Sequence, residues 1–169
     1  MLLRRFTVED APLIFELNTQ PDVLKYLHER TLTGVDDAET VIKEIILPQY
    51  TLYGLGRLAL VEKETGQFMG WCGLKLRPEL NNEVDLGYRM HPAFWGRGLA
   101  TEAAKACLQY GFNEKGLAAI TARAHVNNSA SLNIIKKLDF QFVTSEMLDG
   151  CPVETYTLLR EQYRKKYPG

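Results

Sequence analysis

The sequence predicts a mixed α+β fold built as a single domain over residues 1–169. The chain has 169 residues, 46% of them hydrophobic, which matches one globular domain with a buried core. Turn residues between apolar strands, in the middle and near the end, indicate antiparallel hairpins. A strand–helix–strand–helix–strand order in the second half indicates parallel pairing, because parallel neighbours need a crossover connection. Together these observations predict a mixed, mostly antiparallel sheet that carries helices.

The first third of the chain is predicted to hold one strand and three helices. Residues 2–6 form a short apolar strand, followed by a helix that ends near Asn18. Pro21 opens a second short helix. A third helix begins at Asp36 and is expected to stop near Pro48, because proline removes a helical hydrogen bond.

The middle of the chain is predicted to be β structure. Residues 57–63 and 68–76 form a hairpin around a turn at residues 64–66. Residues 83–90 alternate cleanly between an apolar face and a mostly charged face. The apolar face holds Val84, Leu86, Tyr88 and Met90. The other face holds Glu83, Asp85, Gly87 and Arg89.

The second half alternates helices with strands. A long helix is expected over residues 99–115, with a stripe of small residues that lets it lie close to a sheet. A strand over residues 117–126 follows, and Asn128 caps the next helix. Residues 140–147 and 153–159 then close the sheet as an antiparallel pair.

The composition argues against several classes of protein. Lys and Arg number 20 against 21 Asp and Glu, so a protein held on nucleic acid by charge is not expected. The three cysteines and three histidines show no CxxC or HxxxH spacing, so neither a metal site nor a disulfide framework is predicted. No apolar run approaches the ~18 residues that span a bilayer, and the first residues lack the apolar core of a signal peptide. We therefore expect a cytoplasmic protein with reduced thiols and no membrane partner.

The most informative segment is a glycine-marked loop between a strand and a helix. Gly96 and Gly98 lack a Cβ, so a phosphate can approach the main chain, and free N–H groups at a helix start bind anions. The loop is neither a Walker A nor a GxGxxG motif, and the simpler interpretation is a tight turn. The next helix begins at Asn128, directly after the next strand, so two helix starts reach the sheet edge where ligands of open sheets bind. Ser131, one turn further on, can then face the cleft.

Six parts of the sequence carry a resemblance to a known family. They are the opening, with Leu3, Arg4, Asp10 and residues 15–17, and then Gly66–Leu74, Asp85–Tyr88, Phe94–Ala103, Asn128–Ser131 and Lys137–Phe140. In this order and at these spacings they resemble the GCN5-related N-acetyltransferase (GNAT) superfamily, and within it the branch of ribosomal-protein N-terminal acetyltransferases. The resemblance runs nearly end to end. It implies a GNAT-type sheet, mostly antiparallel, with helices on both faces and a central parallel pair splayed at the acetyl-CoA site.

The resemblance also implies acetyl-CoA as co-substrate, a primary amine as acceptor and no metal. The residues that it assigns to acetyl-CoA binding are Met90, Gly96, Arg97, Gly98, Leu99, Ala100, Thr101, Asn128 and Ser131. Main-chain amides of the loop would hold the pyrophosphate, while Met90 and Asn128 would contact the pantetheine arm. Trp95 stands where the family's loop usually has Gln or Arg, which leaves most of the binding to the amides.

Catalysis requires a base for the amine, which at a pKa of about 10 is mostly protonated at pH 7, and a group that assists the leaving thiolate. Ile135 occupies the position of the tyrosine that many superfamily members use as acid. The resemblance offers Ser131 for that role; the alternative is that Ser131 only caps its helix. Asp85 and Glu83 are candidate bases on one strand face, and the alternative for both is a solvated carboxylate. Further candidates for the base are Glu146, His125 and water.

The acceptor side is expected between Leu24 and Tyr53. Residues 29–44 carry five acidic side chains against two basic ones, a net charge of −3, which would attract a cationic amine; a solvated helix face is the alternative. The acceptor is either a protein or peptide N-terminus or a small-molecule amine, and the chain is expected to be a monomer or a homodimer. Because the tyrosine is missing, the competing hypothesis is a non-catalytic acyl-CoA-binding module.

Overall fold

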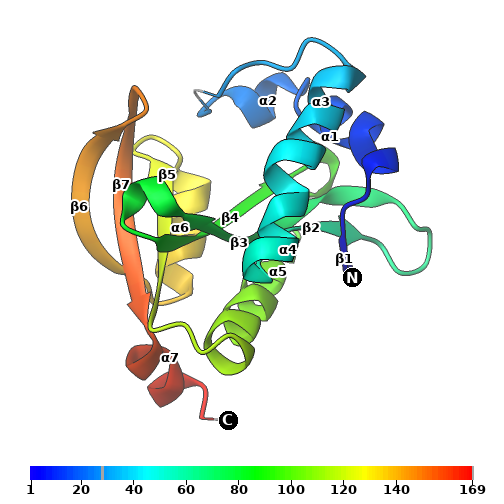
Figure 1. Cartoon of the computed structure of the whole chain (residues 1–169). Helices are drawn as coiled ribbons and strands as arrows, with labels where there is room; N and C mark the ends of the chain where they lie inside the picture. Colours follow the sequence, from blue (N-terminus) through cyan, green and yellow to red (C-terminus); the bar gives the residue numbers. More distant parts are fainter. Residues whose placement is uncertain (28, 169) are drawn as a thin grey trace.

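The computed structural model describes residues 1–27 and 29–168, which form a seven-stranded sheet with helices on both faces (Figure 1). The strands are β1 (Leu2–Arg5), β2 (Gly56–Val61), β3 (Phe68–Arg77), β4 (Glu83–Met90), β5 (Ala119–His125), β6 (Gln141–Leu148) and β7 (Cys151–Leu159). They lie in the order β1-β2-β3-β4-β5-β7-β6. In this described part β4 and β5 pair in parallel and the other neighbours antiparallel, so the predicted mixed, mostly antiparallel sheet is confirmed.

The helices divide into two layers. They are α1 (Ala11–Leu17), α2 (Pro21–Leu24), α3 (Val35–Val41), α4 (Leu47–Tyr53), α5 (Leu99–Gln109), α6 (Ser129–Lys137) and α7 (Arg160–Lys166). One hydrophobic core joins α5 and α6 to β3, β4 and β5, and a second joins α1, α3 and α4 to β2 and β3 on the opposite face (Figure 1). Among the described residues, none of the helices combines the length and apolar character that a membrane crossing requires.

The expectation that the third helix stops near Pro48 is wrong, since helical structure continues to Tyr53. The chain passes from α3 into a π-helical turn over Ile42–Ile46, where the Leu47 N–H donates to the Ile42 carbonyl. This wider turn changes the hydrogen-bond register just before the proline. Pro48 therefore lies in the first turn of α4, where a missing N–H costs little.

The parallel strands β4 and β5 pair only over a short stretch. Within the described chain their register joins Asp85 to Thr121 and Leu86 to Ala122. Beyond that point β4 continues beside β3 as far as Met90, while β5 continues beside β7. The two strands therefore separate into a V, and the predicted splayed central pair is confirmed. The chain leaves the arms of this V to form α5 and α6.

Candidate active site

The loop that leads from β4 into α5 is suited to hold an anion. Gly96 and Gly98 adopt left-handed φ angles of +73° and +72°, and a Cβ placed on either residue would meet no described atom within 4 Å beyond the adjoining chain. Gly98 is the N-cap of α5, and in the described chain no side chain caps this helix. The first-turn amides of Leu99, Ala100 and Thr101 are therefore left to a ligand, at the positive end of the helix dipole.

Two side chains flank this loop. The indole Nε1 of Trp95 donates to the Met90 carbonyl at 2.8 Å, which ties the loop to the end of β4. A carbonyl has two lone pairs, so Met90 keeps acceptor capacity for a ligand. The guanidinium of Arg97 lies 5.6 Å from the Phe94 ring centroid and 4.0 Å from a Glu62 oxygen, and its side chain is half-exposed. A phosphate contact by Arg97 stays a prediction.

Two hydroxyl groups lie together where α6, which follows β5, contacts β4. Asn128 caps α6 as predicted, because its Oδ1 accepts from the Ser131 N–H at 3.1 Å. The Oγ of Ser131 lies 2.9 Å from the hydroxyl of Tyr88 on β4, and that hydroxyl also donates to the Ser131 carbonyl at 3.2 Å. This hydroxyl pair, Ser131 with Tyr88, bridges the two arms of the V. Ile135, by contrast, is buried in the core.

Tyr88 is a candidate functional residue that sequence reasoning missed. The alternation over residues 83–90 places it on the apolar face, where nothing separates it from ordinary core residues. Burial raises the pKa of Tyr88 to about 12, so it stays protonated at neutral pH. The usable signal was a single hydroxyl-bearing residue among apolar ones on the strand that leads to the glycine loop, since a buried tyrosine needs a hydrogen-bond partner.

The candidate bases gather around one guanidinium. Arg123 on β5 lies 2.5 Å from Asp85 and from Glu83, and its Nε lies 3.9 Å from Glu146. Arg77 contacts the other oxygen of Asp85 at 3.1 Å. Burial raises the pKa of Asp85, and the two guanidinium groups oppose that rise. The structure therefore brings the three carboxylates together, as an ion-pair network on the face of β4 opposite the hydroxyl pair.

Two histidines hold loop backbone at the ends of the splayed strands. The Nδ1 of His91 accepts from the Ala93 N–H at 3.2 Å, and the Nδ1 of His125 accepts from the Asn127 N–H at 3.0 Å. The ring of His125 also packs against Tyr26, with centroids 5.3 Å apart. The segment after α2 thus covers the end of β5.

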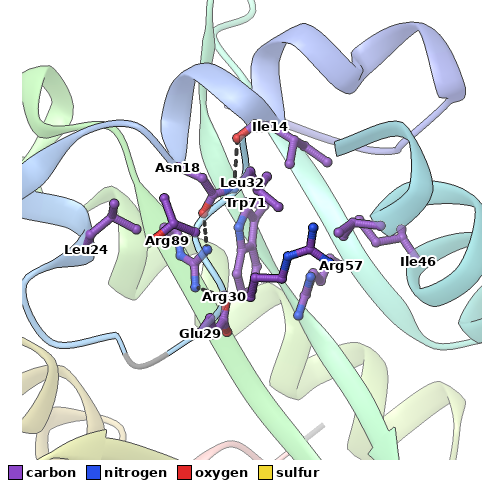
Figure 2. Close-up of a pocket in the computed structure, with 12 residues that line it drawn as sticks. Ile14, Asn18, Leu24, Glu29, Arg30, Leu32, Ile46, Arg57, Trp71 and Arg89 are labelled. Carbon is purple, nitrogen blue, oxygen red and sulfur yellow. Dashed lines mark hydrogen bonds and ion pairs between the residues drawn. The ribbon is translucent and has the colours of Figure 1, made fainter. Parts of the chain in front are cut away.

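A cavity lies on the sheet face that α1 and α3 cover, between those helices, the loop after α2 and β2–β4 (Figure 2). Of the five acidic side chains in residues 29–44, Glu29 lines this cavity within the described chain, while the other four lie along α3 and the turn after it. The same wall carries Arg30, Arg57 and Arg89. The expected acidic entrance is therefore replaced by a mainly basic wall, because the fold adds arginines from β2 and β4 that lie far from this segment in sequence.

Comparisons with known proteins agree with this geometry. Residues 1–141 match the family model described as an acetyltransferase (GNAT) domain. The chain is 30% identical over 170 residues to a Bacillus licheniformis protein named uncharacterized N-acetyltransferase p20, covering 96% of this chain and 94% of that protein.

Two solved structures share the fold. The ribosomal-protein alpha-N-acetyltransferase RimL in complex with coenzyme A has a TM-score of 0.80 at 16% identity, covering 95% of this chain and 94% of that one. The Vibrio cholerae spermidine N-acetyltransferase in complex with CoA and spermine has a TM-score of 0.79 at 17% identity, covering 96% of each chain. At such identities these structures show the fold alone. With the family model matched over most of the sequence, the chain belongs to the GNAT acetyltransferase family.

Proposed function

We propose that this chain transfers an acetyl group from acetyl-CoA to a primary amine, carried by a protein N-terminus or by a small molecule. The observation that carries the proposal is the V between β4 and β5, because β4 leads into an uncapped helix start and also carries one member of the pair of hydroxyl groups. Membership of the GNAT family supports acetyl transfer. The spermidine acetyltransferase that shares the fold is bound to CoA and an amine, spermine.

The residues at the V fit the chemistry of acetyl-CoA. The pyrophosphate needs several donors and close approach to the main chain, which the amides of Gly96–Thr101 and the open space over both glycines supply. The pantetheine arm carries amides that pair with extended backbone, and β4 beyond Leu86 has no partner strand on its β5 side in the described chain. The side-chain NH₂ of Asn128 adds a donor, because its oxygen is already engaged with Ser131.

The reaction forms a bond between the amine nitrogen and the thioester carbonyl carbon, and breaks the carbon–sulfur bond. Negative charge then develops on sulfur. The Tyr88 hydroxyl gives its one hydrogen bond to Ser131, which leaves the Ser131 O–H to donate to the sulfur. A thiol has a pKa of about 8.5, whereas that of Tyr88 is raised to about 12. Full proton transfer from Tyr88 would be uphill by about 3.5 pKa units, or roughly 5 kcal/mol. The hydroxyl pair therefore stabilises the leaving thiolate rather than protonating it.

The amine proton leaves on the opposite face of the sheet. Asp85 and Glu83 point there, and both are held by Arg123. At about 3.3 Å per residue, Asp85 and Glu83 lie about 10 Å and 16 Å along β4 from Tyr88, so a chain of water molecules must carry the proton to their free lone pairs. We therefore propose Asp85 and Glu83 as the base, acting through water.

The proposed acetyl transfer is tested by detecting its products directly. Purified protein is incubated with acetyl-CoA and amines of three kinds, namely short peptides, polyamines and free amino acids, and acetylated products are identified by mass spectrometry. At least one kind should yield an acetylated product together with an equal amount of CoA. Calorimetric binding of acetyl-CoA with no product from any amine would refute catalysis and favour the non-catalytic acyl-CoA-binding module. A protein that does not bind acetyl-CoA would refute the assigned site itself.

A further inference from the structure

The floor of the cavity beside the V is an aromatic ring between two guanidinium groups. Trp71 on β3 lies with Arg57 of β2 on one side and Arg89 of β4 on the other (Figure 2). The guanidinium carbons of Arg57 and Arg89 lie 4.7 Å and 5.4 Å from the Trp71 ring centroid. Sheet register sets this arrangement, because Trp71 pairs with Ala59 on β2 and with Arg89 on β4. A Cβ at Gly87 would come within 3.3 Å of the indole, so this glycine leaves room for it.

The wall of this cavity carries an excess of positive charge. Among the described lining residues, Arg57 and Arg89 face one carboxylate, that of Glu29, while Arg30 is mostly exposed and pairs with Asp37 at 3.5 Å. Arg89 is 9% exposed at its side chain and is satisfied, since it donates to Glu29 at 3.1 Å and to Asn18. Arg57 differs, because the described chain gives its guanidinium the Trp71 ring but no hydrogen bond or ion pair. Burial and repulsion from Arg89 lower the pKa of Arg57 to about 10.

These properties match an anionic group of small size. The planar fork of a guanidinium fits the two oxygens of a carboxylate, and Arg57 has no ion-pair partner in the described chain. Lys75 strengthens the positive field, and its pKa is lowered by burial and by Arg57. The cavity measures about 40 Å³, which at about 10–15 Å³ for each water-sized group holds roughly three such groups. A carboxylate has that size.

The cavity also lies beside the point where acetyl transfer is proposed. Arg89 stands on β4 beyond Leu86, the last residue that pairs with β5 in the described chain. At about 3.3 Å per residue, Arg89 lies only about 7 Å along the strand from Gly87, on the separated arm of the V. The Arg89 side of the cavity therefore adjoins the V, and Arg57 lies two strands further across the sheet.

We propose that the amine acceptor of this enzyme also carries a carboxylate, and that Arg57, held with Arg89 against Trp71, binds that carboxylate. The proposal rests on the acetyl transfer proposed above and narrows its substrate class to small amino carboxylates. A polycationic acceptor is disfavoured, because its charges would face Arg57 and Arg89 with Glu29 as the one lining carboxylate of the described cavity.

The experiment compares each of the twenty L-amino acids with its C-terminal amide, which keeps the amine and removes the negative charge; spermidine is the polycationic probe. Wild-type protein should acetylate at least one free amino acid with a kcat/KM tenfold or more above that of its amide. Arg57→Gln should raise the KM for that amino acid at least tenfold while leaving the KM for its amide and for acetyl-CoA within twofold. Arg57→Lys, which keeps the charge without the fork, should fall between.

Arg5→Gln is the matched control. Arg5 also stacks on an aromatic ring, at 5.1 Å from the Tyr50 centroid, but it lies outside this cavity. Its loss should leave the KM for the amino acid unchanged. If Arg57→Gln does not fold, as judged by its melting temperature, Arg57→Lys decides the question by the same KM comparison.

Three outcomes would overturn the proposal. Amides could have the same kcat/KM as the free amino acids, spermidine could be the best acceptor, or the Arg57 variants could raise the KM for the acid and for the amide equally. A failure of acetyl transfer is distinguishable from these. If acetyl-CoA binds but no amine is acetylated, the proposed function fails, and calorimetry of the same acid and amide pairs on the CoA-bound protein decides the carboxylate site alone. Binding of the free acid that Arg57→Gln abolishes would support the site, and equal binding of acid and amide would refute it.

Discussion

The role of the glycine loop can be tested by pairing Gly98→Ala with Gly66→Ala. Both glycines are left-handed, with φ of +72° and +73°, and an added Cβ on either would meet no described atom within 4 Å beyond the adjoining chain. Both alanines should therefore cost the same backbone strain, about 1–2 kcal/mol. At about 2.1 cal/mol/K per residue, the 169-residue chain should lose roughly 3–6 °C of Tm in either variant. Valine is a poorer choice at Gly98, because a branched side chain adds strain at this φ.

Only the methyl group at Gly98 enters the space where the pyrophosphate is placed. Displacing the phosphate should weaken at least one charge-assisted hydrogen bond, which is worth about 1.5–3 kcal/mol. Loss of about 1.4 kcal/mol is tenfold in affinity, so the Kd of Gly98→Ala for acetyl-CoA should rise at least tenfold. Calorimetry at a temperature where both variants are folded should show Gly66→Ala within twofold of wild type. Equal Kd values for the two variants would remove the Gly96–Thr101 amides from the site.

Three further results are expected. Ser131→Ala and Tyr88→Phe should each lower kcat about ten- to a hundredfold, with little change in the Kd for acetyl-CoA. The double variant should be no slower than the slower single variant. Additive losses in steady-state kinetics would show that the two hydroxyls act separately. Asp10→Asn should cost about 1.5–3 kcal/mol of unfolding free energy at pH 7, because the Asp10 carboxylate accepts two hydrogen bonds of 2.7 Å from Arg4. The pKa of Asp10 is lowered in the folded state, so its stabilisation is present above its ordinary pKa of 3.8 and is lost as pH falls through the folded value. Urea titrations should therefore show the difference in unfolding free energy between wild type and variant shrinking in acid. A difference that does not change with pH would contradict this role. The thiol of Cys151 is partly exposed and the other two are buried, so a thiol reagent should titrate at most one thiol per native chain and three after denaturation; rapid reaction of all three in the native protein would contradict this burial.

Local patterns in the sequence predicted the elements well. Alternation assigned residues 83–90 as a strand, and the structure places β4 over those same residues. Asn128 as a helix cap followed from side-chain chemistry alone, because a cap bonds an amide only a few residues away. The prediction that the third helix stops near Pro48 was wrong, because it considered only the proline and its neighbours along the chain. The π-helical turn that accommodates it depends on packing of Ile42 and Ile46 in the core, which a local rule does not contain.

The candidate site was likewise predictable from the sequence only in part. The glycine loop was predictable, since its function lies in consecutive backbone amides of one segment. The position of Tyr88 beside Ser131 was not, because the two residues are 43 positions apart and meet only after the strand and the helix pack. The three candidate bases could be named from the sequence, but not the guanidinium of Arg123 that holds them.

By itself, the sequence determined what depends on neighbours along the chain: strand and helix periodicity, caps, the anion-binding loop and the resemblance to one family. The tertiary structure alone decided which charges share a cavity. Residues 29–44 predicted an acidic acceptor side, yet Arg57 and Arg89 reach that side from β2 and β4 and make its wall basic. The physical reason is that electrostatic energy depends on distance through space and on burial, and both are set by strand order and register rather than by position in the sequence.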